Sequence, residues 1–444
     1  MAVRKNDIVN GTILDINDDG QGVLKTIDGA VIFVPNALPT EEISTQIINT
    51  KSKFIIGKNI DTKKACEHRI SPACPYYNKC GGCDIMHASN TFQKDFKTNK
   101  IKRILKKFAN IEFDVLPIIS LNEWRYRNKI ALPVSSNGSI GLYKKNSHNI
   151  LPIEDCLITE DFNKFLIQIM NDYINHSKIS CYNEETHSGQ LKHIVARQID
   201  DQILITLVVT KKEIPEKEYL INLLQMHFKN FGLNLNINTL HNNVILGDKW
   251  IPIIGPQELI ANEYGINYPV SNGSFFQVNN KIKKAIYDYV LLNIENNSTV
   301  IDCYSGAGLL SGIISKKAKH CYGIEIVKSA TKNAEVLKAN NNLTNLTNIN
   351  GDCVEILPNL VKNLDFNNLI VTLDPPRKGC DKVVLDSIKS ANPNKIIYIS
   401  CDPTTLARDI KILLESNYKL DSVQPFDMFP QTKHVETVAI ISKI

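Results

Sequence analysis

The feature that most constrains the fold is a repeated order of apolar run, turn and helical segment from residue 271 onward. Five apolar runs are separated mostly by helical patterning: 299–303, 320–326, 369–373, 395–399 and 437–442. This alternation is typical of a parallel sheet with helices on both faces. We therefore predict an α/β fold in which residues 271–444 form a doubly wound, Rossmann-like domain.

The rest of the 444-residue chain is long enough for about two more domains. Short β-rich runs and a hairpin signal at Asp28-Gly29 predict a small OB-type barrel over residues 1–62. Residues 63–90 contain clustered cysteines and little regular structure. Residues 91–270 are expected to form a basic helix followed by a mixed α/β central domain.

The overall composition excludes several classes of protein. With 43% hydrophobic and 22% charged residues, the chain is typical of a globular protein and not of a disordered one. No apolar stretch approaches about 18 residues, and no signal peptide is evident, so we expect a cytoplasmic protein with no membrane association. In that compartment, eleven cysteines indicate metal binding or catalytic sulfur and not disulfides. Nothing indicates an obligate protein partner.

Positive charge is concentrated in one part of the sequence. Residues 91–145 hold twelve Lys or Arg against four Asp or Glu, although the whole chain has a net charge of only +5. Such a window suits a polyanion such as nucleic acid, and it equally suits a solvated helix face. An amphipathic helix is predicted over 92–108, and residues 125–129 interleave cations with Tyr126 as a second candidate RNA contact. Residues 192–197 are a weaker candidate, for which half of a core strand is the favoured interpretation. The candidate cations on the helix are Lys94, Lys97, Lys102, Arg103, Lys106 and Lys107.

A nucleotide-type cofactor site is predicted where the first strand of the C-terminal domain runs into a glycine turn. Gly306 and Gly308 follow that strand, and Glu325 ends the next one. Glycines let the backbone approach a ligand, and an acidic side chain at the second strand binds ribose hydroxyls. The third glycine of the dinucleotide motif is replaced by Ser311. We therefore expect a ligand without pyrophosphate, S-adenosylmethionine and not NAD.

A candidate nucleophile, Cys401, follows the strand at 395–399. Asp402 can cap the next helix, and Pro403 can occupy its first position. A thiol at a helix N-terminus is expected to have a lowered pKa, whereas a buried structural cysteine is the plainer alternative. Near the C-terminus, Glu436 and His434 are both candidate bases, and spacing does not choose between them.

A methyl donor and a thiolate together suggest one chemistry. Thiolate addition to C6 of a pyrimidine makes C5 nucleophilic toward a sulfonium methyl group, and a base then removes the C5 proton. A base-paired target is inaccessible, so the nucleotide must be unpaired or flipped out.

Taken together, these motifs resemble the RNA uracil-5-methyltransferase family over essentially the whole chain. Residues 273–279 resemble the family motif that enters the methyltransferase domain. The resemblance implies that Cys401 is the nucleophile and that Glu436 abstracts the proton. It also implies four residues that contact S-adenosylmethionine: Gln277, Tyr304, Glu325 and Asp374.

The N-terminal region is similar to a TRAM domain, an RNA-binding module, with Thr40 where glycine is more usual. Four cysteines match the ligands of family members that carry a 4Fe–4S cluster, and four cysteines also suit structural zinc. Members with both features usually modify 23S rRNA, so the resemblance implies 23S rRNA as the partner, with a tRNA T-loop uridine as the alternative. The four cysteines are Cys74, Cys80, Cys83 and Cys156.

Two other functions are compatible with parts of the sequence. Asp374-Pro375-Pro376 also resembles the motif of methyltransferases that act on exocyclic amines, but Arg377 replaces the aromatic residue and a cysteine loop follows. A non-catalytic RNA-binding assembly factor is the second alternative. The joint presence of the candidate cofactor, nucleophile and base residues argues against it.

Overall fold

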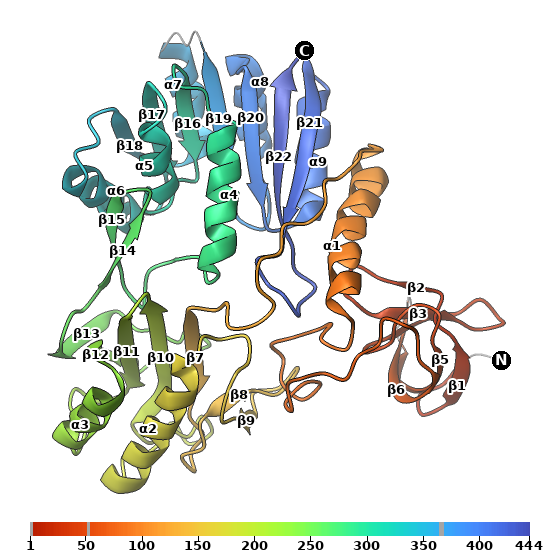
Figure 1. Cartoon of the computed structure of the whole chain (residues 1–444), viewed down its shortest axis with the longest axis vertical. Coiled ribbons are helices and arrows are strands. Elements are labelled where there is room, and N and C mark those ends of the chain that lie inside the picture. The colour runs from red at the N-terminus through yellow and green to blue at the C-terminus, as the bar shows by residue number, and fades with distance from the viewer. Residues whose placement is uncertain (1–2, 51–53, 364–367) are drawn as a thin grey trace.

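A computed structural model describes residues 3–50, 54–363 and 368–444. Figure 1 shows a large sheet with its helices at the top, a central α/β unit below it on the left, and an N-terminal β module on the right. Helix α1 (Asn90–Ile104) stands between the β module and the large sheet. Among the described residues, no helix combines the length and apolarity needed to cross a bilayer.

The C-terminal sheet confirms the predicted doubly wound fold. Its strand order is β18-β17-β16-β19-β20-β22-β21, and β22 runs antiparallel to both neighbours. The two strands missing from the sequence prediction, β18 and β21, are the edges of the sheet, where polar residues are tolerated. The bounds are β16 Thr299–Cys303, β17 His320–Glu325, β18 Leu346–Asn350, β19 Leu369–Leu373, β20 Lys395–Ser400, β21 Tyr418–Phe426 and β22 Glu436–Lys443.

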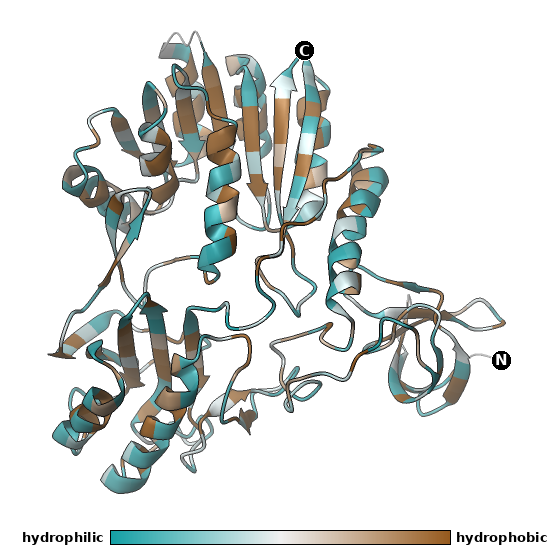
Figure 2. Ribbon diagram, in the orientation of Figure 1, coloured by the Kyte–Doolittle hydropathy of each residue, from teal (hydrophilic) through white to brown (hydrophobic). Residues whose placement is uncertain are grey.

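Helices cover both faces of this sheet and create two separate cores. Successive strand residues point to opposite faces, so Val300 packs into one core and Ile301 into the other. Figure 2 shows the resulting concentration of hydrophobic residues on the inner strands. The helices are α4 Asn280–Leu292, α5 Leu309–Ser315 and α6 Lys328–Asn340 on one side, and α7 Cys353–Asn363, α8 Lys382–Ala391 and α9 Pro403–Leu414 with α1 on the other.

The N-terminal region is β-rich, as predicted. Six strands form one sheet in the order β1-β5-β6-β4-β3-β2, around a small core that includes Leu24, Ile32 and Ile43. Thr40 adopts φ +70°, a left-handed conformation that accounts for the usual glycine at this position. The bounds are β1 Ile8–Thr12, β2 Asp15–Ile16, β3 Gly22–Lys25, β4 Val31–Val34, β5 Glu42–Thr50 and β6 Ile55–Lys64.

The helix predicted at 92–108 is present as α1, which continues as a π-helical turn over Leu105–Ala109. The structure corrects the function given to one of its cations. Lys97 is fully buried in an ion pair with Asp427 and therefore cannot contact RNA. Phe108, the last residue of the predicted amphipathic helix, is exposed. The burial of Lys97 could not be read from a pattern that places lysines around most of the helix.

The central unit is a five-stranded sheet in the order β13-β12-β11-β10-β7, with α2 (Phe162–Ser177) and α3 (Lys217–His227) packed in its core. Two hairpins flank it: β8 (Gly141–Tyr143) with β9 (Ile150–Pro152), and β14 (Leu259–Glu263) with β15 (Ile266–Val270). The second hairpin packs into the α4 core of the C-terminal sheet. The remaining bounds are β7 Lys129–Pro133, β10 Leu191–Ile199, β11 Gln202–Val209, β12 Asn230–Ile237 and β13 Lys249–Ile254.

The predicted RNA contact at residues 125–129 is wrong for most of the segment. Tyr126 is 2% exposed, and its hydroxyl donates to the carbonyl of Pro430 at 3.0 Å. Arg125 forms ion pairs with Asp155 and Asp161. An aromatic ring that is buried in this way cannot stack on a base, so Arg125 and Tyr126 have structural functions.

Candidate active site

Three loops meet at the carboxyl edge of the C-terminal sheet. The chain proceeds from β16 outward to β17 and β18, then returns to β19 on the other side of β16. Cys303 is paired with Leu373 across β16 and β19, so the following residues, Tyr304 and Asp374, lie side by side where the strand order reverses. In open α/β sheets, ligands bind at this reversal point.

The glycine turn after β16 has the geometry of a ligand-binding loop. Tyr304, Gly306 and Gly308 all have positive φ, at 64°, 57° and 79°. A Cβ at Gly308 would lie 2.7 Å from the Cβ of Ala334, so this glycine is required for packing. A Cβ at Gly306 would meet nothing within 4 Å. The backbone at Gly306 therefore faces open space that a ligand can use.

Glu325 is oriented by this turn. One carboxylate oxygen accepts a hydrogen bond from the Gly306 N–H at 2.9 Å, and the other accepts from the Val327 N–H at 2.7 Å. These bonds fix the carboxylate at the end of β17. Its remaining lone pairs are available to hydroxyl groups of a ligand.

A buried acid beneath the turn, Asp302, was not singled out from the sequence. Its carboxylate accepts from the hydroxyls of Ser311 at 2.5 Å and Thr372 at 2.6 Å, and burial raises its pKa to about 6. Ser311, which replaces the third glycine, therefore ties α5 to the first strand. An Asp inside an apolar run is the only sequence signal for this contact.

The loop before α4 is held by the central unit. The Phe276 ring is buried between two cations, with the Arg197 guanidinium carbon 5.2 Å and Lys283 Nζ 3.7 Å from its centroid. Phe275, the preceding residue, is 85% exposed. Asn128 donates from its side chain to the Gln277 carbonyl at 3.0 Å. Anchoring Phe276 therefore leaves Phe275 accessible and positions Gln277.

Residues 192–197 lie in the buried strand β10, which confirms the core-strand interpretation over RNA contact. Arg197 is 1% exposed, and its guanidinium donates to the Ser274 carbonyl at 3.1 Å. Arg197 therefore supports the loop before α4 and does not contact RNA.

Cys401 lies at the N-terminus of α9, as predicted. Asp402 caps the helix by accepting from the Thr404 N–H at 2.8 Å, and Pro403 is the first helical residue. The predicted lowering of the thiol pKa is wrong. Burial and then the nearby carboxylates of Glu436 and Asp374 raise the pKa of Cys401, and the opposing charge of Arg377 does not compensate. Burial first, and then carboxylates from neighbouring strand ends, therefore outweigh any effect of the helix N-terminus.

Glu436 lies opposite Cys401. Ser400 pairs with Thr437 in the antiparallel β20–β22 ladder, so Cys401 and Glu436 occupy the next position. Burial, followed by the charge of Asp374, raises the pKa of Glu436 to about 8. Asp374 itself is exposed, directly after β19. The site therefore combines one thiol with one buried carboxyl group, that of Glu436, which retains its proton near neutral pH.

His434, the competing base, faces a different environment. Burial lowers its pKa, and the charges acting on it come first from Asp84 and Lys433. Its ring packs edge-on toward Phe429, 6.1 Å between centroids. The geometry therefore favours Glu436 over His434 as the partner of Cys401.

The loop that leads to Glu436, residues 427–434, is fixed by buried polar contacts. Lys97 Nζ lies 2.5 Å from the Asp427 carboxylate and 3.0 Å from the Phe429 carbonyl. Gln93 accepts from the Gln431 N–H at 3.1 Å. Helix α1 thus determines where β22 begins, a function that no sequence motif indicated.

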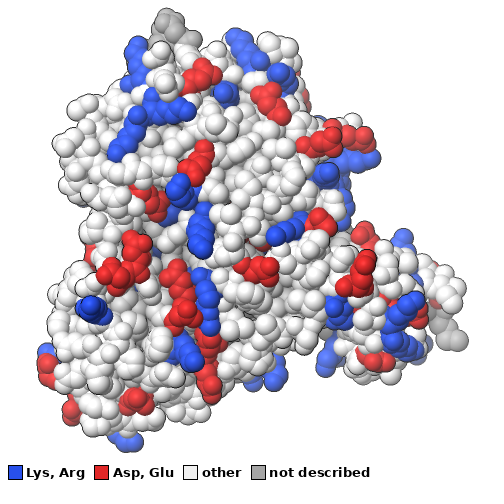
Figure 3. Space-filling view, in the orientation of Figure 1, with Lys and Arg blue, Asp and Glu red and all other residues white. Residues whose placement is uncertain are grey.

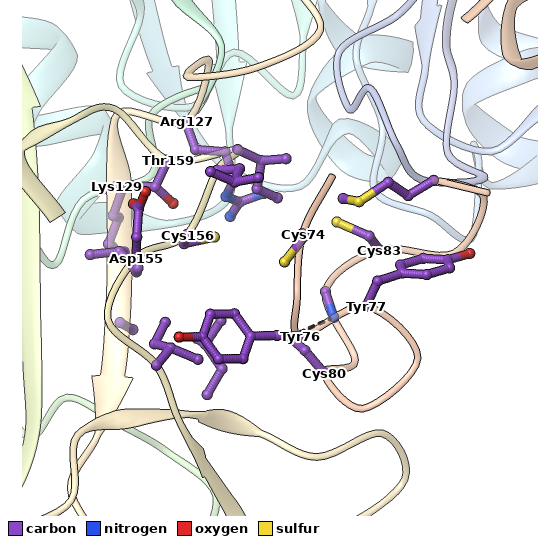
Figure 4. A pocket seen from close by; sticks show the side chains of 18 residues that line it. Cys74, Tyr76, Tyr77, Cys80, Cys83, Arg127, Lys129, Asp155, Cys156 and Thr159 are labelled. Carbon is purple, nitrogen blue, oxygen red and sulfur yellow. Dashed lines mark hydrogen bonds between the residues drawn. The ribbon is translucent and has the colours of Figure 1, made fainter. Parts of the chain in front are cut away.

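The four predicted ligand cysteines line one cavity of about 370 Å³. Figure 4 shows Cys74 and Cys83, on the cysteine-rich segment 63–90 that we call the cysteine loop, facing Cys156 across this cavity. Burial, and then charge on neighbouring cysteines, raises the pKa of the Cys74 and Cys83 thiols. Within residues 3–50, 54–363 and 368–444, no three ligand-type side chains come close enough to hold a single metal ion.

Comparison with known proteins assigns the family. The sequence profile of the tRNA (uracil-5-)-methyltransferase family matches residues 89–444. An uncharacterized RNA methyltransferase of Listeria innocua is 38% identical, over 99% of this chain and 98% of its own. The chain belongs to the RNA uracil-5-methyltransferase family. This uracil-5-methyltransferase is an enzyme that uses S-adenosylmethionine as methyl donor.

The enzyme also resembles a solved structure over nearly its full length. The Pyrococcus abyssi tRNA (uracil-54, C5)-methyltransferase, in complex with S-adenosyl-L-homocysteine, matches with a TM-score of 0.80 and 25% identity, covering 97% of this chain and 99% of that one. A second relative, an uncharacterized RNA methyltransferase of Halalkalibacterium halodurans, is 36% identical over 99% of this chain and 98% of its own.

The ion pair between Lys97 and Asp427 gives a first prediction. Lys97→Met leaves a buried carboxylate without its partner and should lower the free energy of unfolding by about 3–5 kcal/mol, measured by urea denaturation. Lys97→Met combined with Asp427→Leu should recover much of that loss. Lys102→Met, at an exposed lysine of the same helix, should change it by less than about 0.5 kcal/mol. A single variant as stable as the unaltered enzyme would contradict the assignment.

The raised pKa of Glu436 gives a second prediction. The folded protein holds this proton up to about pH 8, whereas the unfolded chain loses it near the ordinary glutamate pKa. Stability contributed by Glu436 therefore falls as pH rises between those values. Glu436→Gln should raise the thermal midpoint at pH 9 relative to the unaltered enzyme, and much less at pH 5. The exposed Glu258→Gln should show no such trend, and a pH-independent effect of Glu436→Gln would refute the assignment.

Proposed function

We propose that this enzyme methylates C5 of a uridine in RNA through a covalent bond between Cys401 and C6 of the base. The observation that carries the proposal is the placement of Cys401 and Glu436 at adjacent strand ends, beside Asp374 and the glycine turn. A nucleophile, a base and a methyl-donor site at one sheet edge are the three components that this chemistry needs.

Four residues are proposed to hold the methyl donor. Glu325, fixed by two backbone N–H groups, suits the ribose hydroxyls. Tyr304 and Asp374 flank the reversal point, and Gln277 is presented by the loop that Asn128 supports. The open space at Gly306 is what a bound nucleoside requires. S-adenosylmethionine supplies an electrophilic methyl group at this edge.

The proposed reaction proceeds in balanced steps. Cys401 loses its proton to solvent, and its sulfur forms a bond to C6, which moves the electron pair of the C5–C6 double bond to C5. C5 takes the methyl group of the sulfonium, the methyl–sulfur bond breaks with its electron pair left on sulfur, and S-adenosyl-L-homocysteine is the leaving group. Glu436, in its deprotonated form, then removes the proton from C5. The electron pair of that C–H bond restores the C5–C6 double bond and expels the Cys401 sulfur. Because the pKa of Glu436 is raised to about 8, a protein base of adequate strength is available once it is deprotonated.

We propose 23S rRNA as the substrate, on the basis of the TRAM-like β module and the four cysteines. One observation favours tRNA instead: the Pyrococcus abyssi enzyme, whose name specifies uracil 54 of tRNA, covers 97% of this chain, including its β module. Figure 3 shows positive and negative side chains interspersed on the face it presents, so surface charge on that face does not favour either RNA.

We also propose that Cys74, Cys80, Cys83 and Cys156 hold a 4Fe–4S cluster. Four thiols around a cavity of about 370 Å³ leave more room than one zinc ion needs. Such a cluster would join the cysteine loop to the central unit, because Cys156 lies just before α2. Its chemistry would be structural, since the methyl transfer proposed above moves no unpaired electron.

The test of the function is a third prediction. Transcripts of 23S rRNA and tRNA carrying uridine tritiated at C5 should release tritium when S-adenosylmethionine is supplied, from 23S rRNA only. Cys401→Ala should release none. Glu436→Gln should accumulate an enzyme–RNA adduct that survives denaturing electrophoresis, because the adduct cannot eliminate. Release from tRNA alone would exclude the ribosomal assignment, and release unchanged in Cys401→Ala would exclude the covalent mechanism.

A fourth prediction concerns the cysteines. Enzyme purified without oxygen should contain about four iron atoms and four acid-labile sulfides per chain. Cys83→Ser should lose most of this iron, whereas Cys181→Ser, at a cysteine outside the cavity, should keep it. One zinc per chain with no sulfide would overturn the cluster assignment and leave the proposed methylation chemistry unaffected.

A further inference from the structure

A second concave site lies on the other side of the cysteine loop. It has a volume of about 510 Å³ and is formed by the segment around Cys80 and by the β8–β9 hairpin. Its walls include Cys80, Gly82, Tyr143, Lys144, Lys145 and His148. We call it the hairpin groove. None of the predicted catalytic or donor-binding residues lines it.

Backbone pairing fixes the two walls relative to each other. Cys80 and Lys144 form an antiparallel bridge. The Lys145 N–H donates to the Lys79 carbonyl at 2.9 Å, and the Gly81 N–H donates to the Tyr143 carbonyl at 3.4 Å. The hairpin groove is therefore a built feature that joins two segments more than 60 residues apart in sequence.

Its charge is positive and unbalanced. Lys144 and Lys145 line the groove, and Lys79 directly precedes its wall residue Cys80. All three lysines are exposed, and none has an ion pair with a carboxylate among the described residues. No Asp or Glu lines the hairpin groove. Exposed lysines held together without acidic partners attract a polyanion, and each phosphate that they bind releases counterions.

Two aromatic rings add a second property. The rings of Tyr143 and His148 lie 6.0 Å apart at 71°. Tyr143 is half-buried, and its hydroxyl lies 3.3 Å from His193 Nε2, whereas His148 is exposed. Aromatic rings beside a row of cations are the arrangement on which unpaired bases stack while their phosphates are neutralised.

A short stretch of chain connects the hairpin groove to the loop of residues 427–434, which leads to Glu436. The segment that forms the groove wall continues into Asp84 and Ile85, whose N–H groups donate to the Gln431 carbonyl at 3.0 and 3.2 Å. Gln431 precedes Glu436 by five residues. An RNA segment in the groove would therefore rest on the same part of the chain that positions the catalytic base.

We propose that the hairpin groove binds a single-stranded RNA segment flanking the target uridine, with its phosphates on Lys79, Lys144 and Lys145 and a base against Tyr143 and His148. This inference rests on the proposed function, which supplies RNA as the substrate.

The fifth prediction tests it by equilibrium binding of the full-length holoenzyme to 23S rRNA and tRNA transcripts at several salt concentrations. Lys144→Gln with Lys145→Gln should weaken binding roughly tenfold and lower the slope of log affinity against log salt by about 1.5. His148→Ala should weaken binding and leave the slope unchanged, because it removes stacking and no phosphate contact. The affinity for S-adenosylmethionine and kcat at saturating RNA should not change.

A matched control is Lys211→Gln with Lys212→Gln, which removes the same charge from adjacent exposed lysines outside the hairpin groove. Equal loss in both double variants would show a diffuse charge effect and overturn the proposal, as would unchanged affinity and slope in Lys144→Gln with Lys145→Gln. Binding is measured without methyl transfer, so a failed methylation assay with intact groove-dependent binding would reject the chemistry and keep the groove.

Discussion

The buried ion pair between Lys97 and Asp427 is the contact on which the arrangement of this enzyme most depends. Both side chains are at most 1% exposed, so water cannot replace either partner. The hydroxyl of Ser120 donates a hydrogen bond to the second carboxylate oxygen of Asp427 at 3.1 Å. Such a pair contributes little net stability compared with apolar packing, but breaking it is costly. It therefore serves mainly to specify one position of α1 against the loop that leads to Glu436.

Other parts of the chain make contact with the same loop. The β module reaches it through Asp19 and Lys433, at 2.7 Å, and the central unit reaches it through the hydroxyl of Tyr126. The side-chain amide of Asn279, at the start of α4, donates to the Met428 carbonyl at 3.2 Å. The β module, the central unit and α4 thus all contact the loop of residues 427–434. This loop leads to Glu436, the proposed catalytic base, so this residue and the units packed against the loop share a common support.

Much of the catalytic edge was predictable because its residues follow strand ends, and parallel strands bring their carboxyl ends to one side. Glu325, Asp374 and Cys401 could be placed in this way from local patterns alone. The failures have one physical origin. Tyr126 and Lys97 were assigned to RNA from their residue type, but their exposure depends on segments distant in sequence. The pKa of Cys401 was judged from its own helix, although burial and then the carboxylates of Glu436 and Asp374 raise it.

The sequence by itself determined the doubly wound sheet, the glycine turn and the helix cap at Asp402. These depend on local periodicity, backbone conformation and residues adjacent in sequence. The uracil-methyltransferase character of the chain followed from the resemblance of its motifs to a known family. Only the tertiary structure decided which cations are exposed to solvent and which of Glu436 and His434 faces Cys401. It also decided that the ring of Phe276 contacts both Arg197 and Lys283. The physical reason is that burial and electrostatic environment are properties of what packs around a side chain, and those neighbours come from other parts of the chain.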